Sequence, residues 1–139
     1  MLVDAERALF NRLGVFVGGC RLDAAEAVFD GEQAVGVDLL DGLASLVEKS
    51  LVVRRIDADG EPRFWMLETI REFALDLLAA SGELEEMRRR HGEYYLSLAE
   101  RIDDESRTGD QARLFDELER ENANLRAAVE WSRDSGNAE

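Results

Sequence analysis

The change of hydrophobic period between residues 51 and 66 is the feature that most restricts the fold. Residues 51–56 (LVVRRI) are short and β-branched, Asp59-Gly60 is a strong turn signal, and residues 63–66 (RFWM) can return as a second strand. Pro62 would begin that second strand, where a missing N–H group is tolerated. The segment therefore predicts a β-hairpin within a chain whose other periodic segments are helical.

Helices are predicted on both sides of this hairpin. Their expected ranges are about 4–13, 23–29, 37–49 and 68–80. The apolar stripe of the third consists of Leu39, Leu40, Leu43, Leu46 and Val47. The inward face of the fourth consists of Ile70, Phe73, Ala74, Leu77 and Leu78.

The order of these elements predicts the fold of the first part of the chain. Three helices, a β-hairpin and a closing helix that ends at Ser81-Gly82 describe a winged helix-turn-helix, which we assign to residues 1–82. The short β-rich stretch Val15–Val17 is expected to pair with the hairpin. Gly18-Gly19 after it lacks the G-x-x-x-x-G-K-[ST] pattern of a phosphate loop, so a tight turn is the better interpretation.

Residues 83–139 differ in character and predict an antiparallel helical hairpin. A long helix over about 83–103 carries an apolar stripe that includes His91, and a second helix is expected over about 110–135. The exposed apolar face of that last helix is predicted to consist of Leu114, Leu118, Leu125 and Val129. Such a pair of helices is typical of the start of a helical repeat array, whose later repeats would dock on this face. The whole chain is thus expected to be mostly α with a small β-sheet.

Charge argues against direct binding of nucleic acid by this chain. The formal net charge is −14, and the third helix, which would enter a major groove, presents Asp38, Asp41, Ser45 and Glu48, with Lys49 as its one positive charge. Carboxylates at such positions would face phosphates. Under the alternative in which DNA is bound, the contacts would come from a cluster of basic residues in the wing. This cluster consists of Arg54, Arg55 and Arg63.

Catalytic chemistry is not indicated. Cys20 is the one cysteine and His91 the one histidine, so neither an internal disulfide nor a Cys/His metal cluster is expected. No catalytic, cofactor-binding or metal-ligating residues are predicted, and His91 is interpreted as a histidine packed at a helix interface. The chain also lacks the pattern of a signal peptide or a membrane span, which predicts a cytoplasmic setting without membrane partners.

Several runs carry a family resemblance. The runs LFNRLGVFVGGCRLDAAEAV, LLDGLASLVEKSLVV and FWMLETIREFALDLL resemble the winged-helix segment of bacterial STAND-type regulatory ATPases, many of them LuxR-type or AfsR-like transcriptional regulators. RRRHGEYYLSLAE and LERENANLRAAVEW resemble the stretch that leads into their tetratricopeptide-like repeats. The resemblance implies a parent protein with ATP or ADP in a separate P-loop domain, and no Walker motif occurs in this chain.

The resemblance also implies a contact site. Related ATPases carry a Met-His-Asp motif whose histidine contacts the ADP phosphate, and Met66-Leu67-Glu68 stands at that place here. Leu67 cannot donate a hydrogen bond to phosphate. Contact with the nucleotide domain is therefore assigned to Met66, Leu67, Glu68 and Arg71, with the alternative that Met66 and Leu67 are core and Glu68 caps the fourth helix.

Two functions follow from these patterns. The first is a non-catalytic regulatory module of a larger STAND-type transcriptional regulator, which couples the nucleotide domain to a helical sensor region through contacts within the parent chain. The alternative is a self-contained winged-helix repressor that binds DNA and dimerises through its C-terminal helices.

Overall fold

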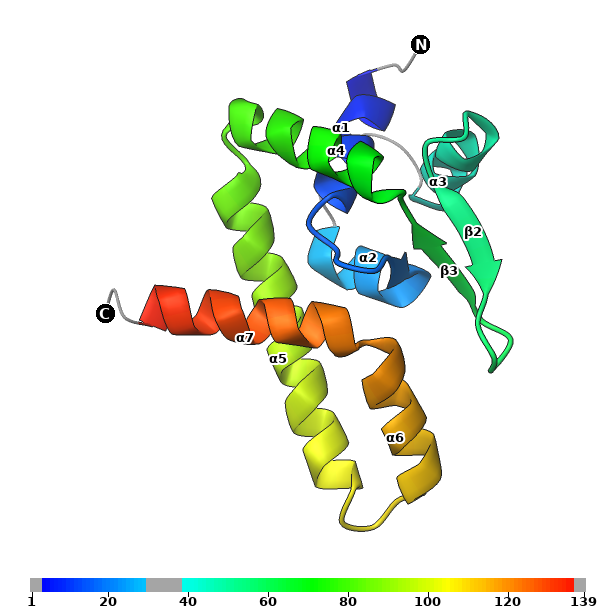
Figure 1. Ribbon diagram of the computed structural model, residues 1–139, viewed down its shortest axis with the longest axis vertical. Helices are drawn as coiled ribbons and strands as arrows, with labels where there is room; N and C mark the ends of the chain where they lie inside the picture. Colours follow the sequence, from blue (N-terminus) through cyan, green and yellow to red (C-terminus); the bar gives the residue numbers. More distant parts are fainter. Residues whose placement is uncertain (1–3, 30–38, 137–139) are drawn as a thin grey trace.

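The computed structural model describes residues 4–29 and 39–136 and has the predicted fold class: mostly helical, with a small antiparallel sheet. Figure 1 shows the winged helix in the upper part and the helical hairpin below it. In chain order the elements are α1 (Asp4–Leu13), β1 (Cys20–Arg21), α2 (Leu22–Phe29), α3 (Leu39–Glu48), β2 (Val53–Ile56), β3 (Pro62–Trp65), α4 (Glu68–Ser81), α5 (Leu84–Glu105), α6 (Gln111–Arg120) and α7 (Asn122–Gly136). The start of the third predicted helix, at residues 37 and 38, lies outside the described residues, and so does the predicted exposed position of Asp38.

The sheet has the strand order β1-β3-β2, and both pairs are antiparallel. The hairpin is as predicted, with Val53 opposite Trp65 and Ile56 opposite Pro62. The third strand is Cys20–Arg21, with Cys20 opposite Phe64, so the assignment of Val15–Val17 to a strand was wrong. The reason is that α1 runs on into turns: the N–H groups of Val15 and Phe16 donate to Arg12 and Leu13, and no ladder bonds remain for them.

The two glycines before β1 make the turn that places this strand. Gly18 and Gly19 have φ of +78° and +81°, in the left-handed region that side chains with a Cβ disfavour. Gly19 also lies so close to β3 that a Cβ there would be 2.5 Å from both the Phe64 carbonyl oxygen and the Trp65 Cβ. The tight-turn interpretation is therefore confirmed, and close approach to β3 adds a second reason for glycine at position 19.

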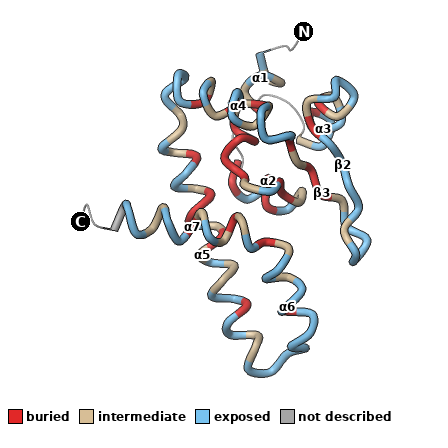
Figure 2. The backbone as a smooth tube through the Cα atoms, in the orientation of Figure 1, coloured by how far each residue is buried: buried red, intermediate tan, exposed pale blue. Residues whose placement is uncertain are grey.

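Most of the predicted apolar stripes face the core. Leu43 and Leu46 of α3 and Ala74 and Leu78 of α4 have no exposed surface, and Figure 2 shows the buried positions gathered where α1, α2, α3 and the sheet meet. Two stripe positions were predicted wrongly. Leu40 is 53% exposed and Phe73 is 58% exposed, because each lies at the edge of its stripe and is not covered by a neighbouring element.

The helical hairpin departs from prediction at one point. The stripe of α5 is buried as expected, including Met87, Tyr95 and Ile102. The last helix, expected to be continuous, is broken at Glu121 into α6, which runs beside α5, and α7, which crosses it (Figure 1). The crossing is close: a Cβ on Gly92 would be 2.3 Å from the Trp131 ring.

The buried core runs continuously from the winged helix into the hairpin. Phe16, Phe64 and Leu78 belong to the same cluster as Tyr95 of α5 and Ala128 of α7. Phe16 makes edge contacts with both Phe29 and Tyr95, at ring centroid distances of 6.0 and 6.3 Å. The division into residues 1–82 and 83–139 stays a prediction, because the two parts share one core.

We expect Gly19→Ala to destabilise the fold by more than about 2 kcal/mol, because it combines a positive φ with a clash against the β3 backbone. Gly60→Ala is the matched control: its φ is +91°, but nothing lies within 4 Å of the added Cβ, so a loss of about 1 kcal/mol is expected. Urea unfolding followed by circular dichroism measures both. Equal losses would contradict the close-approach argument.

Candidate functional site

A buried ion pair joins the wing to the helical hairpin. Arg63 of β3 donates from Nη1 to Glu121 Oε2 at 2.9 Å and from Nη2 to Glu121 Oε1 at 3.2 Å. Its Nε donates to the Gly18 carbonyl at 3.0 Å, and Nη2 also to the Gly19 carbonyl at 3.2 Å. The side chains of Arg63 and Glu121 are only 10% and 8% exposed. The Arg63 guanidinium therefore bonds both to the Gly18-Gly19 turn and to the break between α6 and α7.

The electrostatics of this pair favour the charged forms. Burial alone would lower the pKa of Arg63, but the hydrogen bonds and negative charge of Glu121 outweigh it and raise that pKa. A buried charge pair is stable only where its geometry is good and the remaining donors are satisfied. Here the arginine forks onto both carboxylate oxygens, and two backbone carbonyls accept from it as well.

Asn124 of α7, which has no exposed surface, continues the junction toward α5. Its Oδ1 accepts from the Val17 N–H at 2.6 Å, and its Nδ2 donates to the Gly19 carbonyl at 2.8 Å. Those two backbone partners fix which end of the amide is oxygen. Because His91 Nε2 lies 2.9 Å from the same Oδ1, Nε2 must carry the proton. We call Arg63, His91, Glu121 and Asn124 the junction network.

His91 sits inside the junction as a neutral ring. It is 3% exposed, and its ring lies against those of Phe16 and Tyr95, with centroids 5.4 and 4.8 Å apart. Burial lowers its pKa below the ordinary value of 6.5, the bond to Asn124 opposes this, and the positive charge of Arg71 adds to the lowering. The predicted packing of His91 at a helix interface is confirmed.

Sequence reasoning missed Glu121 and Asn124. A signal for Glu121 was present: at 100° per residue it falls in the middle of the apolar stripe formed by Leu114, Leu125 and Ala128. A carboxylate on an apolar stripe calls for a buried cationic partner. Nothing in the sequence identified Arg63 as that partner.

Ion pairs also hold the tip of the wing. Arg21 of β1 bonds Asp57 at 3.0 Å and Asp59 at 2.9 Å, and Arg120 of α6 lies 3.8 Å from Asp59. Burial acts to raise the pKa of Asp59, but the hydrogen bonds from Arg21 and the Glu61 N–H and the nearby arginine charges lower it overall. The wing carboxylates are thus neutralised within the chain.

In the structure, the three arginines of the predicted DNA-contact cluster do not share one role. Arg63 is committed to Glu121 and is unavailable to a phosphate, because its strand position points it at the hairpin. Arg54 and Arg55 are exposed on β2, and the Arg55 guanidinium stacks over the Trp65 ring at 4.3 Å. Only two of the three arginines therefore remain for DNA.

The helix that would read the groove is acidic, as predicted. Asp41 and Glu48 of α3 are exposed. Lys49, which follows α3, bonds Glu6 of α1 at 2.7 Å, and Ser45 donates to the same carboxylate. Its positive charge is thereby neutralised, and Ser45 is half-buried instead of facing solvent.

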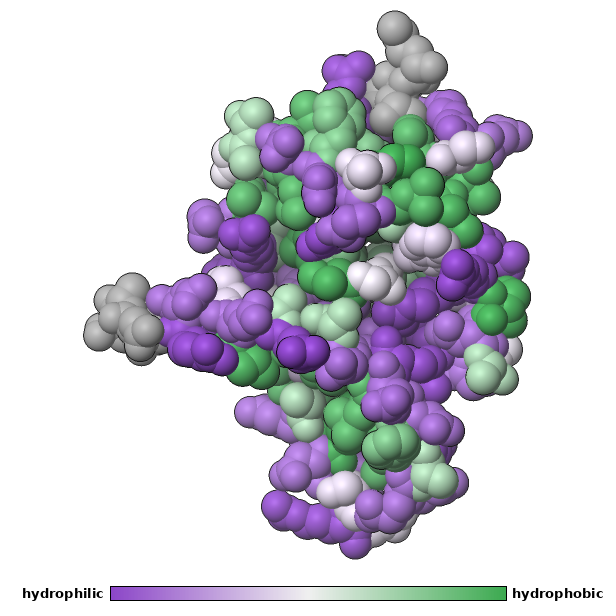
Figure 3. All heavy atoms as spheres, in the orientation of Figure 1, coloured by the Kyte–Doolittle hydropathy of each residue, from purple (hydrophilic) through white to green (hydrophobic). Residues whose placement is uncertain are grey.

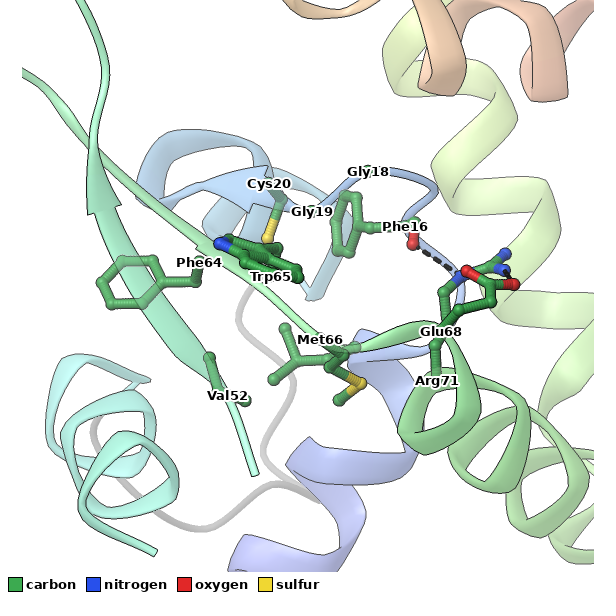
Figure 4. Close-up of a pocket in the computed structure, with 11 residues that line it drawn as sticks. Phe16, Gly18, Gly19, Cys20, Val52, Phe64, Trp65, Met66, Glu68 and Arg71 are labelled. Atoms are coloured by element: carbon green, nitrogen blue, oxygen red, sulfur yellow. Dashed lines mark hydrogen bonds and ion pairs between the residues drawn. The ribbon is translucent and has the colours of Figure 1, made fainter. Parts of the chain in front are cut away.

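Three of the four predicted nucleotide-domain contacts line a cavity of about 260 Å³. Figure 4 shows Met66, Glu68 and Arg71 at its wall together with Phe16 and the glycine turn. Arg71 donates from Nε to the Phe16 carbonyl at 2.9 Å and from Nη1 to Glu68 at 3.2 Å. Glu68 makes no capping bond, so its assignment as a cap was wrong.

Burial differs between Met66 and Leu67, the two residues that precede α4. Met66 is buried against the core, whereas Leu67 is 53% exposed and does not line the cavity. The alternative in which both are core is therefore right for Met66 and wrong for Leu67.

Reactive groups are scarce around this cavity. Cys20 lines it, but burial raises the pKa of its thiol to about 12, which keeps it protonated and a poor nucleophile. Within residues 4–29 and 39–136 no three His, Cys, Asp or Glu side chains are grouped as a metal site. In the same ranges, no helix has the length and apolar character needed to cross a bilayer.

The predicted repeat-docking face is only partly exposed. Leu114 is buried and Leu125 packs against the core, because α6 and α7 fold back onto α5. Leu118 and Val129 are 39% and 49% exposed, and Phe115, which was not predicted, is 61% exposed. The available apolar surface is therefore Phe115, Leu118 and Val129.

Comparison with known proteins agrees with this geometry. The family pattern of the winged helix-turn-helix domain matches residues 2–79, which contain α1 to β3 and nearly all of α4. The chain belongs to the winged helix-turn-helix domain family. No solved structure matches it significantly.

Mycobacterial proteins are similar over nearly the whole chain. "Putative HTH-type transcriptional regulator Rv0890c" of Mycobacterium tuberculosis is 43% identical over 136 residues, which cover 98% of this chain and 15% of that protein. A Mycobacterium bovis protein of the same description matches to the same extent. "Uncharacterized protein Rv0894" of M. tuberculosis is 38% identical over 92 residues, 66% of this chain and 23% of that protein. The winged helix-turn-helix domain and the hairpin thus span a small share of these relatives.

Removing the arginine of the junction network should be severe. We expect Arg63→Met to lower the free energy of unfolding by about 3–5 kcal/mol, because Glu121 is left buried without a partner. Arg89→Met removes an exposed arginine that pairs with Glu86 and Glu93, and it should cost far less, because solvent screens that pair. Urea denaturation measures both, and similar losses would show that the buried pair has no special weight.

Stability should also depend on pH through His91. The unfolded chain takes up a proton near pH 6.5, whereas the folded ring resists it, so stability falls as pH drops from about 7 toward 5. We expect this slope to be shallower in His91→Gln, which keeps a donor for Asn124 but does not titrate. Urea midpoints at a series of pH values provide the measurement. Parallel slopes for the two proteins would contradict the assignment.

Proposed function

We propose that this chain is a non-catalytic regulatory module of a winged-helix transcriptional regulator, working through contacts with other parts of a larger protein. The junction network carries the proposal. It ties the wing to the helical hairpin through the buried ion pair between Arg63 and Glu121. A wing held in this way is better suited to connect parts of the protein than to contact DNA as a free loop.

The acidic surface supports the same conclusion. Asp41 and Glu48 are exposed on α3, and the nearby Lys49 is paired with Glu6. The formal net charge of −14 opposes the displacement of counterions on which phosphate binding depends. A surface of this sign suits contact with proteins better than contact with nucleic acid.

The partners that we propose are a nucleotide-binding P-loop domain and helical repeats of the same parent, as in STAND-type ATPases. The similarity of the mycobacterial relatives over only 15% of their length supports a larger setting. Leu67, exposed beside Glu68 and Arg71, is the side chain through which the nucleotide domain would pack, by apolar contact. ATP or ADP would be bound by that separate domain. Phe115, Leu118 and Val129 would receive the repeats.

A DNA-binding repressor that dimerises through its C-terminal helices is the second candidate. Two observations favour it: the relatives are named HTH-type transcriptional regulators, and Arg54 and Arg55 are exposed on the wing. It requires those two arginines to outweigh the carboxylates of α3. The same exposed apolar residues on α6 and α7 would then form the dimer interface.

Fluorescence anisotropy of a labelled DNA duplex at low salt separates these functions, because phosphate contacts are strongest there. We expect no rise in anisotropy up to the high micromolar range. The Arg54→Ala, Arg55→Ala double variant is the matched control, since both side chains are exposed and their loss should leave the fold intact. A salt-sensitive rise with the natural chain that the double variant loses would establish the second candidate and refute the first.

A further inference from the structure

An apolar groove between α1 and α4 lies away from every site described above. It has a volume of about 640 Å³. The residues that line it, which define the α1–α4 groove, are Arg7, Phe10, Leu51, Thr69, Ile70, Phe73 and Leu77. Figure 3 shows apolar surface in this upper part of the molecule, bordered by hydrophilic side chains. Phe10 belongs to the core, and Leu51, Ile70 and Leu77 pack against the core while part of their surface lines the groove.

Phe73 is the anchor that makes this groove unusual. It is 58% exposed although it lies on the apolar side of α4, and its ring approaches that of the buried Phe10 with centroids 6.3 Å apart. Ile70 and Leu77, one turn away on either side, extend the apolar strip along the helix. A large aromatic side chain left in water beside a hollow is a typical anchor for a partner.

The charges beside the groove indicate the sign of that partner. At 100° per residue, Glu72 and Asp76 lie on the outer flank of Phe73, and both are exposed. Neither forms an ion pair with another described residue, whereas Arg7 on the opposite wall pairs with Asp4. The flank therefore carries two negative charges that nothing in the described chain neutralises.

We infer that the α1–α4 groove binds a basic amphipathic helix of another protein segment, whose apolar face covers Phe73 and whose Lys or Arg side chains meet Glu72 and Asp76. A groove between two helices, lined over two turns of α4, fits a single helix laid along it. A second copy of this chain is the wrong occupant, because each copy has a formal net charge of −14 and would bring acidic surface against acidic surface.

The test uses a fluorescein-labelled helical peptide of about 14 residues, the length of α4, with a leucine stripe and lysines elsewhere. A second peptide carries glutamate in place of every lysine. We expect saturable binding of the lysine peptide by the full chain and none of the glutamate peptide. Phe73→Asp should weaken binding by about tenfold or more, whereas Phe115→Asp, an equally exposed phenylalanine on α6, should not.

A charge-matched pair of variants separates groove binding from general attraction to an acidic protein. Glu72→Gln with Asp76→Gln should weaken the lysine peptide several-fold, whereas Glu100→Gln with Glu119→Gln removes the same charge from exposed sites on α5 and α6 and should not. Circular dichroism establishes that each variant is folded, and Phe73→Ser replaces Phe73→Asp if the aspartate disturbs α4. Equal weakening by both pairs overturns the proposal. So does a homodimer, seen by sedimentation, that Phe73→Asp dissociates.

Discussion

The bidentate salt bridge between Arg63 and Glu121 is the interaction on which the arrangement of the molecule depends. Removing two charges from water costs several kcal/mol per ion, so the pair persists only because both carboxylate oxygens and the spare arginine donors are satisfied. The last helix is interrupted at Glu121, and α7 leaves this break to cross α5. The ion pair thus fastens the break between α6 and α7 to β3.

The fold of the first part was predictable because its signals are local. The Asp59-Gly60 turn, the β-branched run before it and the helical stripes each specify their own element, and the structure has them within a few residues. The place of the third strand was not predictable, because it depends on how far α1 continues its turns through Val15 and Phe16. Local propensity favoured a strand there, and backbone hydrogen bonding to α1 prevailed.

The candidate site likewise combines a part that was predictable from the sequence with a part that was not. The family resemblance assigned Met66, Leu67, Glu68 and Arg71 to one contact site. Met66, Glu68 and Arg71 do line one cavity, because they are close in the chain, whereas Leu67 does not line it. Sequence reasoning grouped Arg63 with Arg54 and Arg55, and there it was wrong. Arg55 stands opposite Arg63 in the hairpin, so both side chains lie on the same face of the sheet, and contact with Glu121, 58 residues away, gives Arg63 its separate role. Periodicity alone does not predict which residues pair across so many intervening residues. A glutamate in the middle of an apolar stripe does indicate that the glutamate has a buried partner.

Four ion pairs join distant parts of the chain, whereas the acidic exterior follows from the composition. Arg12, Arg21, Lys49 and Arg63 are each paired with a carboxylate far away in the sequence. Each pair removes one positive and one negative charge, so the formal net charge of −14 is left to the other residues. On a surface of this sign, phosphate binding would depend on a local basic cluster, and Arg54 and Arg55 are the exposed arginines of β2.

The junction network also explains how a partner bound at α4 could affect the position of α7 without a hinge between them. Arg71 bonds the Phe16 carbonyl, the Phe16 ring lies against His91, and His91 donates to Asn124 of α7. Each of these contacts is buried or partly buried, and the chain of contacts runs along the wall of the cavity that Phe16 and Arg71 line. A partner that moved Arg71 would therefore have to move the glycine turn and α7 together or break the contact with Phe16. Coupling of that kind needs no second conformation of the module itself, because the change of state would lie in the nucleotide domain that we propose to pack on Leu67.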